Sequence, residues 1–310
     1  MTAAALCGAV GVGPAHAGED PTEAVADLIG DVAPDQGQVV KGAVEGDQIV
    51  AEVRSTEVSV PVDPDQPIVL DGPGSAPTVT VSLPAEVTVD TAQVADDGTV
   101  VYHATDDGAS AAVQVLDNGS TRLQTITPDA NGPREFTYTF GDGIVPVVHT
   151  DRTVSLVRRA GGVEVALGSI EEAWAVDAAG EPVETAYRVD GRALVQVVVP
   201  SAETSYPVVA DPSVSLGRLI YVKYDKSEVK RTVTSGLNDK LKYQAILCAV
   251  VPVPAVQLGC GFVAYDIVSS IAATTKTAYR NGRCVEIDYT YNGLPVSWKT
   301  IACSTSIGRG

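Results

Sequence analysis

Pairs of turn-forming residues recur about every ten residues between positions 46 and 215, and they constrain the fold more than any other feature. They are Asp97-Gly98, Asp107-Gly108, Asn118-Gly119, Gly161-Gly162 and Asp190-Gly191. Asp, Asn and Gly tolerate the positive φ angles that tight hairpin turns need. The stretches between the turns, such as TVVYHA and TRLQTI, are short and show no helical periodicity. We therefore expect an antiparallel, sandwich-like or barrel-like β-rich module over 46–215, with a strand order that the pattern does not specify.

The composition favours the same fold class. Hydrophobic residues make up 45% of the 310 positions, which excludes a wholly disordered chain. Because there are only three Phe and one Met, the core must be built largely from Val, Ala, Leu and Ile. Branching at Cβ favours strands, and the length is sufficient for one large domain or two ordinary ones.

The first 17 residues have the features of a signal peptide. A short apolar stretch ends at Ala15-His16-Ala17, which fits an A-x-A cleavage site. The stretch has no Lys or Arg before it, so we expect the true start to lie upstream; a disordered tail is the alternative. Cleavage after Ala17 would leave four cysteines in an oxidising compartment, which predicts a secreted protein with two disulfides.

Residues 18–45 are acidic and rich in small side chains. One short helix is predicted there, with Asp20 as its cap, Pro21 in its first turn and Gly30 as its end. We expect this segment to be a linker that precedes the folded module.

The charge divides the chain in two. Residues 217–310 hold twelve Lys and Arg against six Asp and Glu, whereas residues 1–216 hold nine against thirty-three. The net charges are +6 and −24, which together give the −18 of the whole chain. An acidic front part and a mildly basic back part are typical of two modules with different partners. A charge of +6 interleaved with acids does not favour nucleic acid as a partner.

The back part, 216–310, is predicted to be a small α+β domain. It begins with a strand, RLIYVKY, followed by a helix that Ser227 caps and Gly236 ends. A second helix is expected from Asn238 or Asp239 to the prolines at 252 and 254, and a third over 255–279. The chain then closes with a β-hairpin.

The last hairpin predicts one disulfide. A four-residue loop at 292–295 would place Tyr291 opposite Val296, and Cys284 would then lie opposite Cys303. A two-residue turn would shift this register. The remaining pair, Cys248 and Cys260, flanks the turn between the second and third helices, where a bridge would hold both helices together.

The segment CAVVPVPAVQLGC at 248–260 is the strongest membrane-span candidate, because residues 243–265 carry no charge. Pro252 and Pro254 interrupt a helix near the middle of that stretch. We therefore predict the bend of a helical hairpin and no stable transmembrane span.

Residues 173–214 resemble a module of secreted actinobacterial proteins with the pattern AWAVDAxGxPVxTxY, LVQVV and YPVVADP. The matching positions are Trp174, Asp177, Gly180, Pro182, Thr185, Tyr187, Gln196, Tyr206, Pro207, Asp211 and Pro212. Some large secreted proteins with toxin-like ends carry a related YPVxxDP segment before their C-terminal domains, and 216–310 resembles such a domain more weakly. The resemblance implies secretion and a boundary near 215. It implies no catalytic residue.

Little in the chain points to catalysis. His103 and His149 are each followed closely by Asp, so a His/Asp metal or acid–base site is one hypothesis, and two surface histidines are the other. The chain has no HExxH, GxSxG, SxxK or P-loop pattern. Asp63, Asp65 and Asp71 miss the spacing of a calcium loop. We predict no catalytic residue, metal or cofactor.

A cluster of basic residues is the predicted binding patch. Its members are Lys223, Lys226, Lys230, Arg231, Lys240 and Lys242. A basic face beside apolar helices suits an anionic cell envelope, whereas the alternative is a disulfide-closed domain whose helices form its own core.

Three functional hypotheses follow. The first is a secreted, non-enzymatic protein whose β-rich module presents a C-terminal domain that acts on envelopes or other cells, in a bacteriocin-like or membrane-active way. The second is an extracellular module that binds a cell-wall polymer or a protein. The third is a hydrolase that uses carboxylates or the two histidines.

Overall fold

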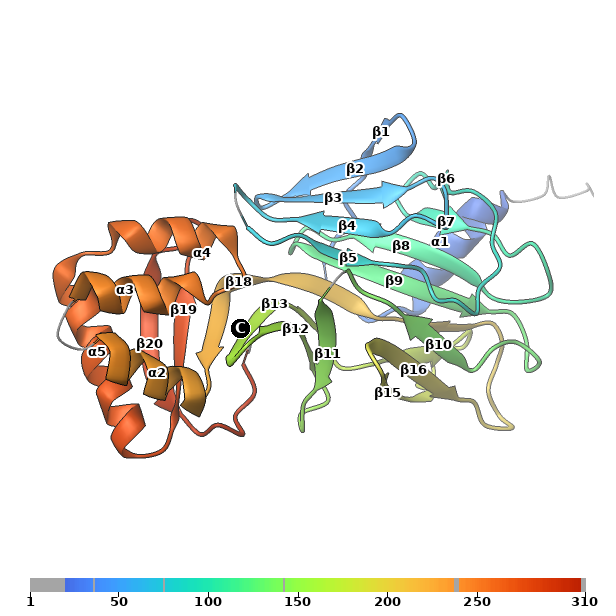
Figure 1. The fold of residues 1–310 in the computed structure, drawn as a ribbon. Coiled ribbons are helices and arrows are strands. Elements are labelled where there is room, and N and C mark those ends of the chain that lie inside the picture. Colours follow the sequence, from blue (N-terminus) through green and yellow to red (C-terminus); the bar gives the residue numbers. More distant parts are fainter. Residues whose placement is uncertain (1–19, 36, 75, 142, 237–239, 308–310) are drawn as a thin grey trace, which may run out of the picture.

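A computed structural model describes residues 20–35, 37–74, 76–141, 143–236 and 240–307 of the chain (Figure 1). The side chains at 236, 240–242 and 260 are outside that description. The predicted signal peptide, 1–17, also lies outside the described residues.

The described chain is mainly β. Its helices are α1 Pro21–Val32, α2 Lys226–Gly236, α3 Lys240–Ala249, α4 Pro254–Gly259 and α5 Tyr265–Arg280, with a 3-10 turn, η1, at Cys260–Phe262. The first ten strands are β1 Ala43–Glu45, β2 Gln48–Val53, β3 Thr56–Pro61, β4 Ile68–Asp71, β5 Val79–Val81, β6 Gln93–Val94, β7 Val100–Tyr102, β8 Ser110–Val115, β9 Ser120–Thr127 and β10 Glu135–Tyr138. The other ten are β11 Ile144–Val148, β12 Val154–Ala160, β13 Val163–Ile170, β14 Ala175–Asp177, β15 Glu184–Asp190, β16 Ala193–Val199, β17 Val208–Ala210, β18 Ser213–Tyr224, β19 Cys284–Tyr289 and β20 Pro295–Ile301.

The strands form antiparallel sheets, as the turn spacing predicts. One sheet has the order β1-β2-β3-β4-β5, a second has β10-β16-β15, and the largest contains the path β11-β12-β13-β18-β9-β8-β7-β6. Gly98, Gly119, Gly161 and Gly191 all have positive φ at hairpin turns. The turn dipeptides therefore mark the ends of strands, because their glycines adopt the positive φ angles that hairpin turns need.

The first sheet packs face to face on the large one, which makes the β-rich part sandwich-like (Figure 1). Val58, Leu70 and Val81 from the first sheet share one core with Tyr102 and Val113 from the large sheet. All these side chains are at most 2% exposed, so Val and Leu with a few aromatic residues fill the interior.

Residues 20–45 belong to this fold and do not form a free linker. Asp20 caps α1 by accepting a hydrogen bond from the backbone N–H of Thr22. Ile29 of α1 packs against Val101 and Ile126 on the other face of the large sheet. The helix continues past the predicted end at Gly30 to Val32, because packing of its apolar face outweighs the low helix propensity of one glycine.

The expected boundary near 215 falls inside a strand. β18 is 12 residues long; its N-terminal end pairs with β9 and its C-terminal end, Ile220–Tyr224, pairs with β19. β13 pairs with β18 along most of its length. The front part and the C-terminal part therefore share a strand, a sheet and a core (Figure 1).

The C-terminal part has the predicted α+β character, with helices α2–α5 beside the hairpin β19–β20 (Figure 1). Two details differ from the expectation. Asp225, and not Ser227, caps α2, since its carboxylate accepts from the backbone N–H of Glu228 at 2.9 Å. The predicted helix over 255–279 is divided into α4, η1 and α5, because glycines at 259 and 261 weaken the helix there.

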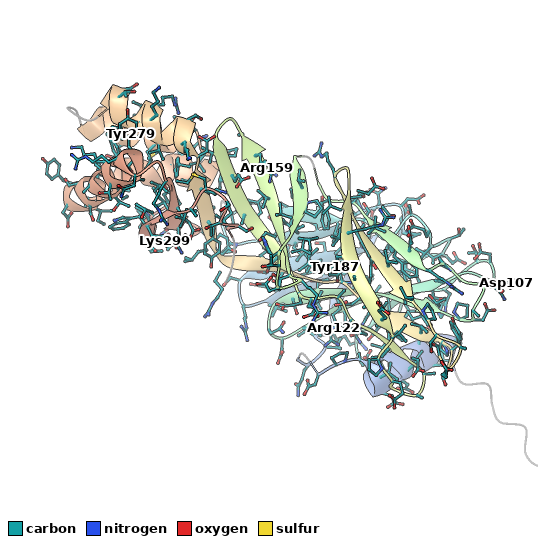
Figure 2. All side chains as sticks on the ribbon, turned by 90° about the horizontal axis from the view of Figure 1, so that it is seen from below. Asp107, Arg122, Arg159, Tyr187, Tyr279 and Lys299 are labelled. Carbon is teal, nitrogen blue, oxygen red and sulfur yellow. A yellow bond between two sulfur atoms is a disulfide. The ribbon has the colours of Figure 1, made fainter. Side chains whose placement is uncertain are left out.

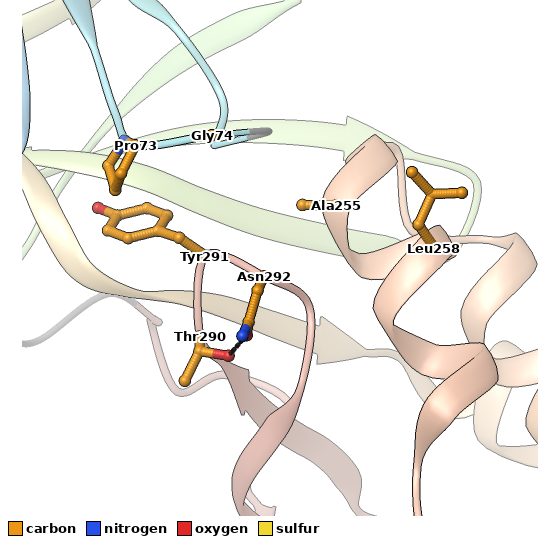
Figure 3. A pocket seen from close by; sticks show the side chains of 7 residues that line it. All are labelled: Pro73, Gly74, Ala255, Leu258, Thr290, Tyr291 and Asn292. Atoms are coloured by element: carbon orange, nitrogen blue, oxygen red, sulfur yellow. Dashed lines mark hydrogen bonds between the residues drawn. The ribbon is translucent and has the colours of Figure 1, made fainter.

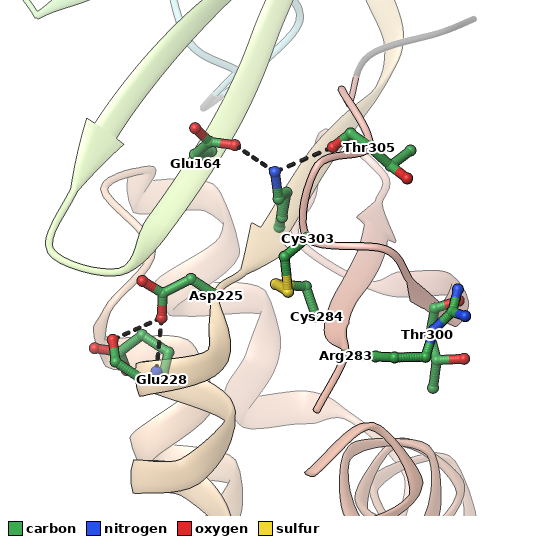
Figure 4. The surroundings of a disulfide bond; sticks show 10 residues. Glu164, Asp225, Glu228, Arg283, Cys284, Thr300, Cys303 and Thr305 are labelled. Carbon is green, nitrogen blue, oxygen red and sulfur yellow. Dashed lines mark hydrogen bonds and ion pairs between the residues drawn. A yellow bond between two sulfur atoms is a disulfide. The ribbon is translucent and has the colours of Figure 1, made fainter. Parts of the chain in front are cut away.

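The disulfide Cys284–Cys303 is present, with Cα atoms 5.0 Å apart (Figure 4). The register that predicted it is wrong. Cys284 lies opposite Ile301, because the turn closes with Tyr289 opposite Pro295 and not with Tyr291 opposite Val296. The irregularity between Asp288 and Tyr289 recovers only one residue of this difference, and Cys303 lies two residues beyond its cross-strand position. Cys248 is also disulfide-bonded. The side chain of Cys260 lies outside the described residues, so the Cys248–Cys260 pairing stays a prediction.

None of the helices in the described part of the chain is both long enough and apolar enough to cross a membrane.

Candidate binding surface

Two members of the predicted basic patch are held in ion pairs. Lys223 has a side chain only 11% exposed; its Nζ lies 3.0 Å from Glu164 and donates to the backbone oxygen of Thr305. Arg231 pairs with Glu228 on the same helix. Lys226, Lys230 and Arg231 are the exposed members among the described side chains. The side chains of Lys240 and Lys242 lie outside the described residues.

The two histidines do not form a site together. His103 follows β7 and contacts the Thr22 hydroxyl of α1, whereas His149 follows β11. Five strands separate β7 from β11, which is on the order of 30 Å along the sheet. No group of three or more potential metal ligands occurs in the described residues.

His149 does lie beside a serine. Its Nε2 is 2.7 Å from Ser155 Oγ, but that hydroxyl donates its proton to the backbone oxygen of Ile307. Both side chains are buried. A hydroxyl engaged in this way beneath the C-terminal segment is not poised to attack a substrate.

Exposed apolar side chains gather in two segments of the C-terminal part. Leu258, Phe262 and Tyr265 are 68%, 85% and 70% exposed, and Leu294 and Val296 are 38% and 51% exposed. We call these five residues the apolar surface. They are half of the large hydrophobic side chains exposed in the described chain. Scattered exposed apolar residues are ordinary, but a group of this kind indicates an interaction site.

The two segments meet because glycines allow close contact between their backbones. A Cβ atom on Gly259 would overlap the backbone at Asn292 and Gly293, and one on Gly293 would overlap Ala255. Gly293 also has φ +82°, which favours glycine. The turn between β19 and β20 therefore packs directly on α4, and just beyond it Pro295 and Val263 line the same small cavity.

An open cavity of about 580 Å³ adjoins the apolar surface (Figure 3). Pro73 and Gly74 line it from the loop between β4 and β5, and Ala255 and Leu258 line it from α4. Thr290, Tyr291 and Asn292 of the hairpin turn complete the lining. Leu258 belongs to both the cavity and the apolar surface. The cavity thus lies where the helical end meets the sandwich.

The electrostatics of this region are neutral to acidic. Residues 243–265 carry no charge, and the exposed Asp266 follows directly at the start of α5. Burial raises the pKa of the nearby Tyr291 phenol to about 12, so it stays neutral, and it donates to the backbone oxygen of Gly217. The basic end of the domain is thus not at the apolar surface, as far as the described side chains extend.

Several residues of the segment 173–214, among them Asp177, Gln196 and Asp211, are buried in the β-rich part. Asp177 accepts hydrogen bonds from the backbone N–H groups of Ser205, Glu181 and Ala179, which lower the pKa of its carboxyl. It thereby ties the turn after β14 to the segment before β17.

Asp211 is the centre of a second buried group. Its Oδ1 accepts from the backbone N–H of Trp174 at 3.2 Å and from the Tyr187 hydroxyl at 3.5 Å. Burial raises the pKa of the Asp211 carboxyl to about 8, although the Trp174 N–H and the charge of Arg122 act in the opposite direction. Figure 2 shows Arg122 and Tyr187 in the β-rich part, far from Tyr279 in the helical end. Sequence reasoning assigned no role to these residues.

A groove lies beside the disulfide. Its volume is about 400 Å³, and Arg159, Glu164, Lys223, Cys284 and Cys303 are among its lining residues (Figure 4). Burial would raise the pKa of Glu164, but hydrogen bonds from Lys223 and Arg159 outweigh it and lower that pKa. Three of the charges in the groove, those of Arg159, Glu164 and Lys223, are therefore paired with one another.

No family model and no curated protein matches the chain. The fold and the surface define a mainly antiparallel β protein that carries a disulfide-closed α+β end with an exposed apolar surface.

Proposed function

We propose that this chain is a secreted, non-enzymatic binding protein, in which the β-rich part holds the C-terminal part and the apolar surface contacts the target. The observation that carries the proposal is the exposure of Leu258, Phe262 and Tyr265, together with Leu294 and Val296 of the hairpin whose turn packs on α4. Exposed aromatic and leucine side chains on a firmly held support are what a binding site needs, because they lose little entropy on association.

Secretion is part of the proposal. The Cys284–Cys303 disulfide and the disulfide-bonded Cys248 suit an oxidising compartment. The apolar N-terminal stretch with Ala15-His16-Ala17 fits export through a cleaved leader.

The target that these features favour is a protein with an apolar patch and a neutral or basic rim. Residues 243–265 carry no charge, and the carboxylate of Asp266 borders the apolar surface. This local charge would repel an anionic lipid headgroup and attract a basic side chain of a protein. Lys223 and Arg231 each form an ion pair with a glutamate, which also argues against the membrane-active hypothesis.

The first test measures binding to other surfaces. Full-length protein is mixed with vesicles of phosphatidylglycerol and phosphatidylcholine, and separately with purified peptidoglycan. We expect the protein to stay in solution in both assays and to cause no dye leakage from the vesicles. If the protein floats with the vesicles and Phe262→Ser abolishes this flotation, the target is a membrane and not a protein. If the protein is retained on peptidoglycan and Phe262→Ser does not change this retention, the β-rich part carries the binding function.

A further inference from the structure

Two side chains on the hairpin β15–β16 share a hydrogen bond that the Gln196 carboxamide donates to the Thr185 hydroxyl. Gln196 is fully buried on β16, and its Nε2 lies 3.2 Å from the hydroxyl oxygen of Thr185 on β15. Tyr187 lies directly opposite Gln196, so Thr185 is its diagonal neighbour on the same face of the hairpin. A hydroxyl held this close to a carboxamide is a nucleophile beside an acyl group.

The carboxamide is fixed and incompletely satisfied. Its Nε2 also donates to the backbone oxygen of Trp174 at 3.1 Å, which defines which end of the side chain is nitrogen. Its Oε1 is buried and has no hydrogen-bond partner among the described residues. Buried polar atoms are nearly always paired, so an unpaired carbonyl oxygen in a native interior needs a physical reason.

The same cluster contains a buried acid with an unpaired oxygen. Oδ2 of Asp211 has no hydrogen-bond partner in the described part of the chain, while its backbone N–H and Nε2 of Gln196 both donate to the Trp174 carbonyl. The raised pKa keeps a proton on this carboxyl at neutral pH. A protonated carboxyl can donate a hydrogen bond to a carbonyl oxygen on which negative charge develops.

We propose that Thr185 and Gln196 form an intramolecular ester cross-link. Thr185 Oγ1 bonds to the side-chain carbonyl carbon of Gln196, and the bond from that carbon to Nε2 breaks. The hydroxyl proton moves to the nitrogen, which leaves as ammonia, and the carbonyl oxygen is retained. The step needs no oxidant or other reactant. Thr185 is only half-buried, which gives the ammonia a route to solvent.

The cross-link has a structural purpose. β15 lies at one edge of the three-stranded sheet, and most of its residues are exposed. A covalent bond to β16 would hold this edge strand in a secreted protein that meets proteases and variable conditions.

Mass spectrometry of the full-length protein under reducing conditions tests the proposal. The wild type is expected to be lighter than its sequence by one ammonia molecule, and peptide mapping is expected to give a branched peptide that joins Thr185 to Gln196. Hydroxylamine should open the ester. Thr185→Val should have the full sequence mass, and Thr185→Ser should retain the loss because it keeps the hydroxyl.

Asn–Gly pairs such as Asn118-Gly119 can lose ammonia through succinimide formation, so the control has to separate the two reactions. A succinimide would persist in Thr185→Val and would give no branched peptide. Asp211→Asn is expected to slow the loss of ammonia. In the wild type the rate of this loss should decline above about pH 8, and the variant should not show that decline. A wild-type protein that has the full sequence mass after prolonged incubation, or that gives only succinimide peptides, would overturn the proposal.

Discussion

Asp211 is held away from water between the ends of several strands, and its partners are mostly neutral groups. The Trp174 N–H and the Tyr187 hydroxyl both donate to the same carboxyl oxygen, and Arg122 contributes a more distant positive charge. This environment favours the protonated form, because burial penalises the carboxylate more than these contacts stabilise it.

The pH dependence of stability follows from this residue. The folded protein keeps the Asp211 proton up to about pH 8, whereas the unfolded chain loses it near the ordinary value of 3.8. The folded state therefore binds more protons between these values, and the contribution of Asp211 to stability falls as the pH rises through this window. Asp211→Asn should remove that decline. Urea unfolding at pH 5 and pH 8 measures it.

Asp266→Asn is the matched control, since Asp266 is exposed. We expect it to keep the wild-type difference between the two pH values. If Asp211→Asn behaves in the same way as this control, Asp211 is ionised in the folded protein and the account of its environment is incorrect.

At the scale of elements, the contact between the hairpin turn and α4 depends on Gly293. Gly293→Ala would combine left-handed strain of about 1–2 kcal/mol with an overlap at Ala255. Gly282→Ala carries the strain alone, because φ is +60° and no atom lies within 4 Å of the added carbon. The free energy of unfolding should fall further for Gly293→Ala than for Gly282→Ala, as measured by urea unfolding. Equal losses would show that the turn does not pack on α4 as described.

The disulfide joins the start of β19 to the segment after β20, with a sequence separation of 19 between its cysteines. Replacing both Cys284 and Cys303 by Ser should lower the free energy of unfolding by about 3 kcal/mol, because a loop of this size is no longer closed in the unfolded chain. Denaturant unfolding without reductant measures the loss. A double variant as stable as the wild type would mean that this bond adds no net stability to the folded protein.

The sequence predicted elements better than it predicted contacts between them. Turn glycines such as Gly119 and Gly191 act locally, so their positions could be predicted from the chain alone. The hairpin register could not, because the chain did not reveal that the turn closes at Tyr289 and Pro295, and the irregularity beside Tyr289 has no sequence signal of its own.

At the candidate site, too, the sequence predicted the elements better than the contacts between them. The segment 248–260 was predicted to be the bend of a helical hairpin and not a binding site, although it contains Leu258 of the apolar surface. Phe262 and Tyr265 were expected inside a continuous helix, and the break at η1 exposes them. Lys223 was expected in a basic face, but its partner Glu164 is distant in the sequence and becomes its neighbour only through the pairing of β13 with β18.

At the scale of the whole molecule, β18 makes the two parts of the chain one structure. Its pairing with β9, β13 and β19 connects the sandwich to the hairpin on which the helices pack. A fragment that begins at residue 216 would lose the first part of this strand, so binding is best measured with the complete chain. The apolar surface is then presented by a continuous sheet and not by a flexible tether.

The most direct test of the binding function is the affinity for a target captured through the apolar surface. A photoreactive amino acid at position 262 is used to cross-link a protein from the medium and envelope of bacteria, and the captured protein is purified. We expect it to bind the wild type with an affinity that the double variant Leu258→Ser/Phe262→Ser weakens at least about 30-fold, which corresponds to about 2 kcal/mol. The control double variant Val189→Ser/Val199→Ser, which alters exposed valines elsewhere, should bind as the wild type does. Equal affinities of the two double variants, or equal capture from position 189, would contradict the assignment of binding to the apolar surface.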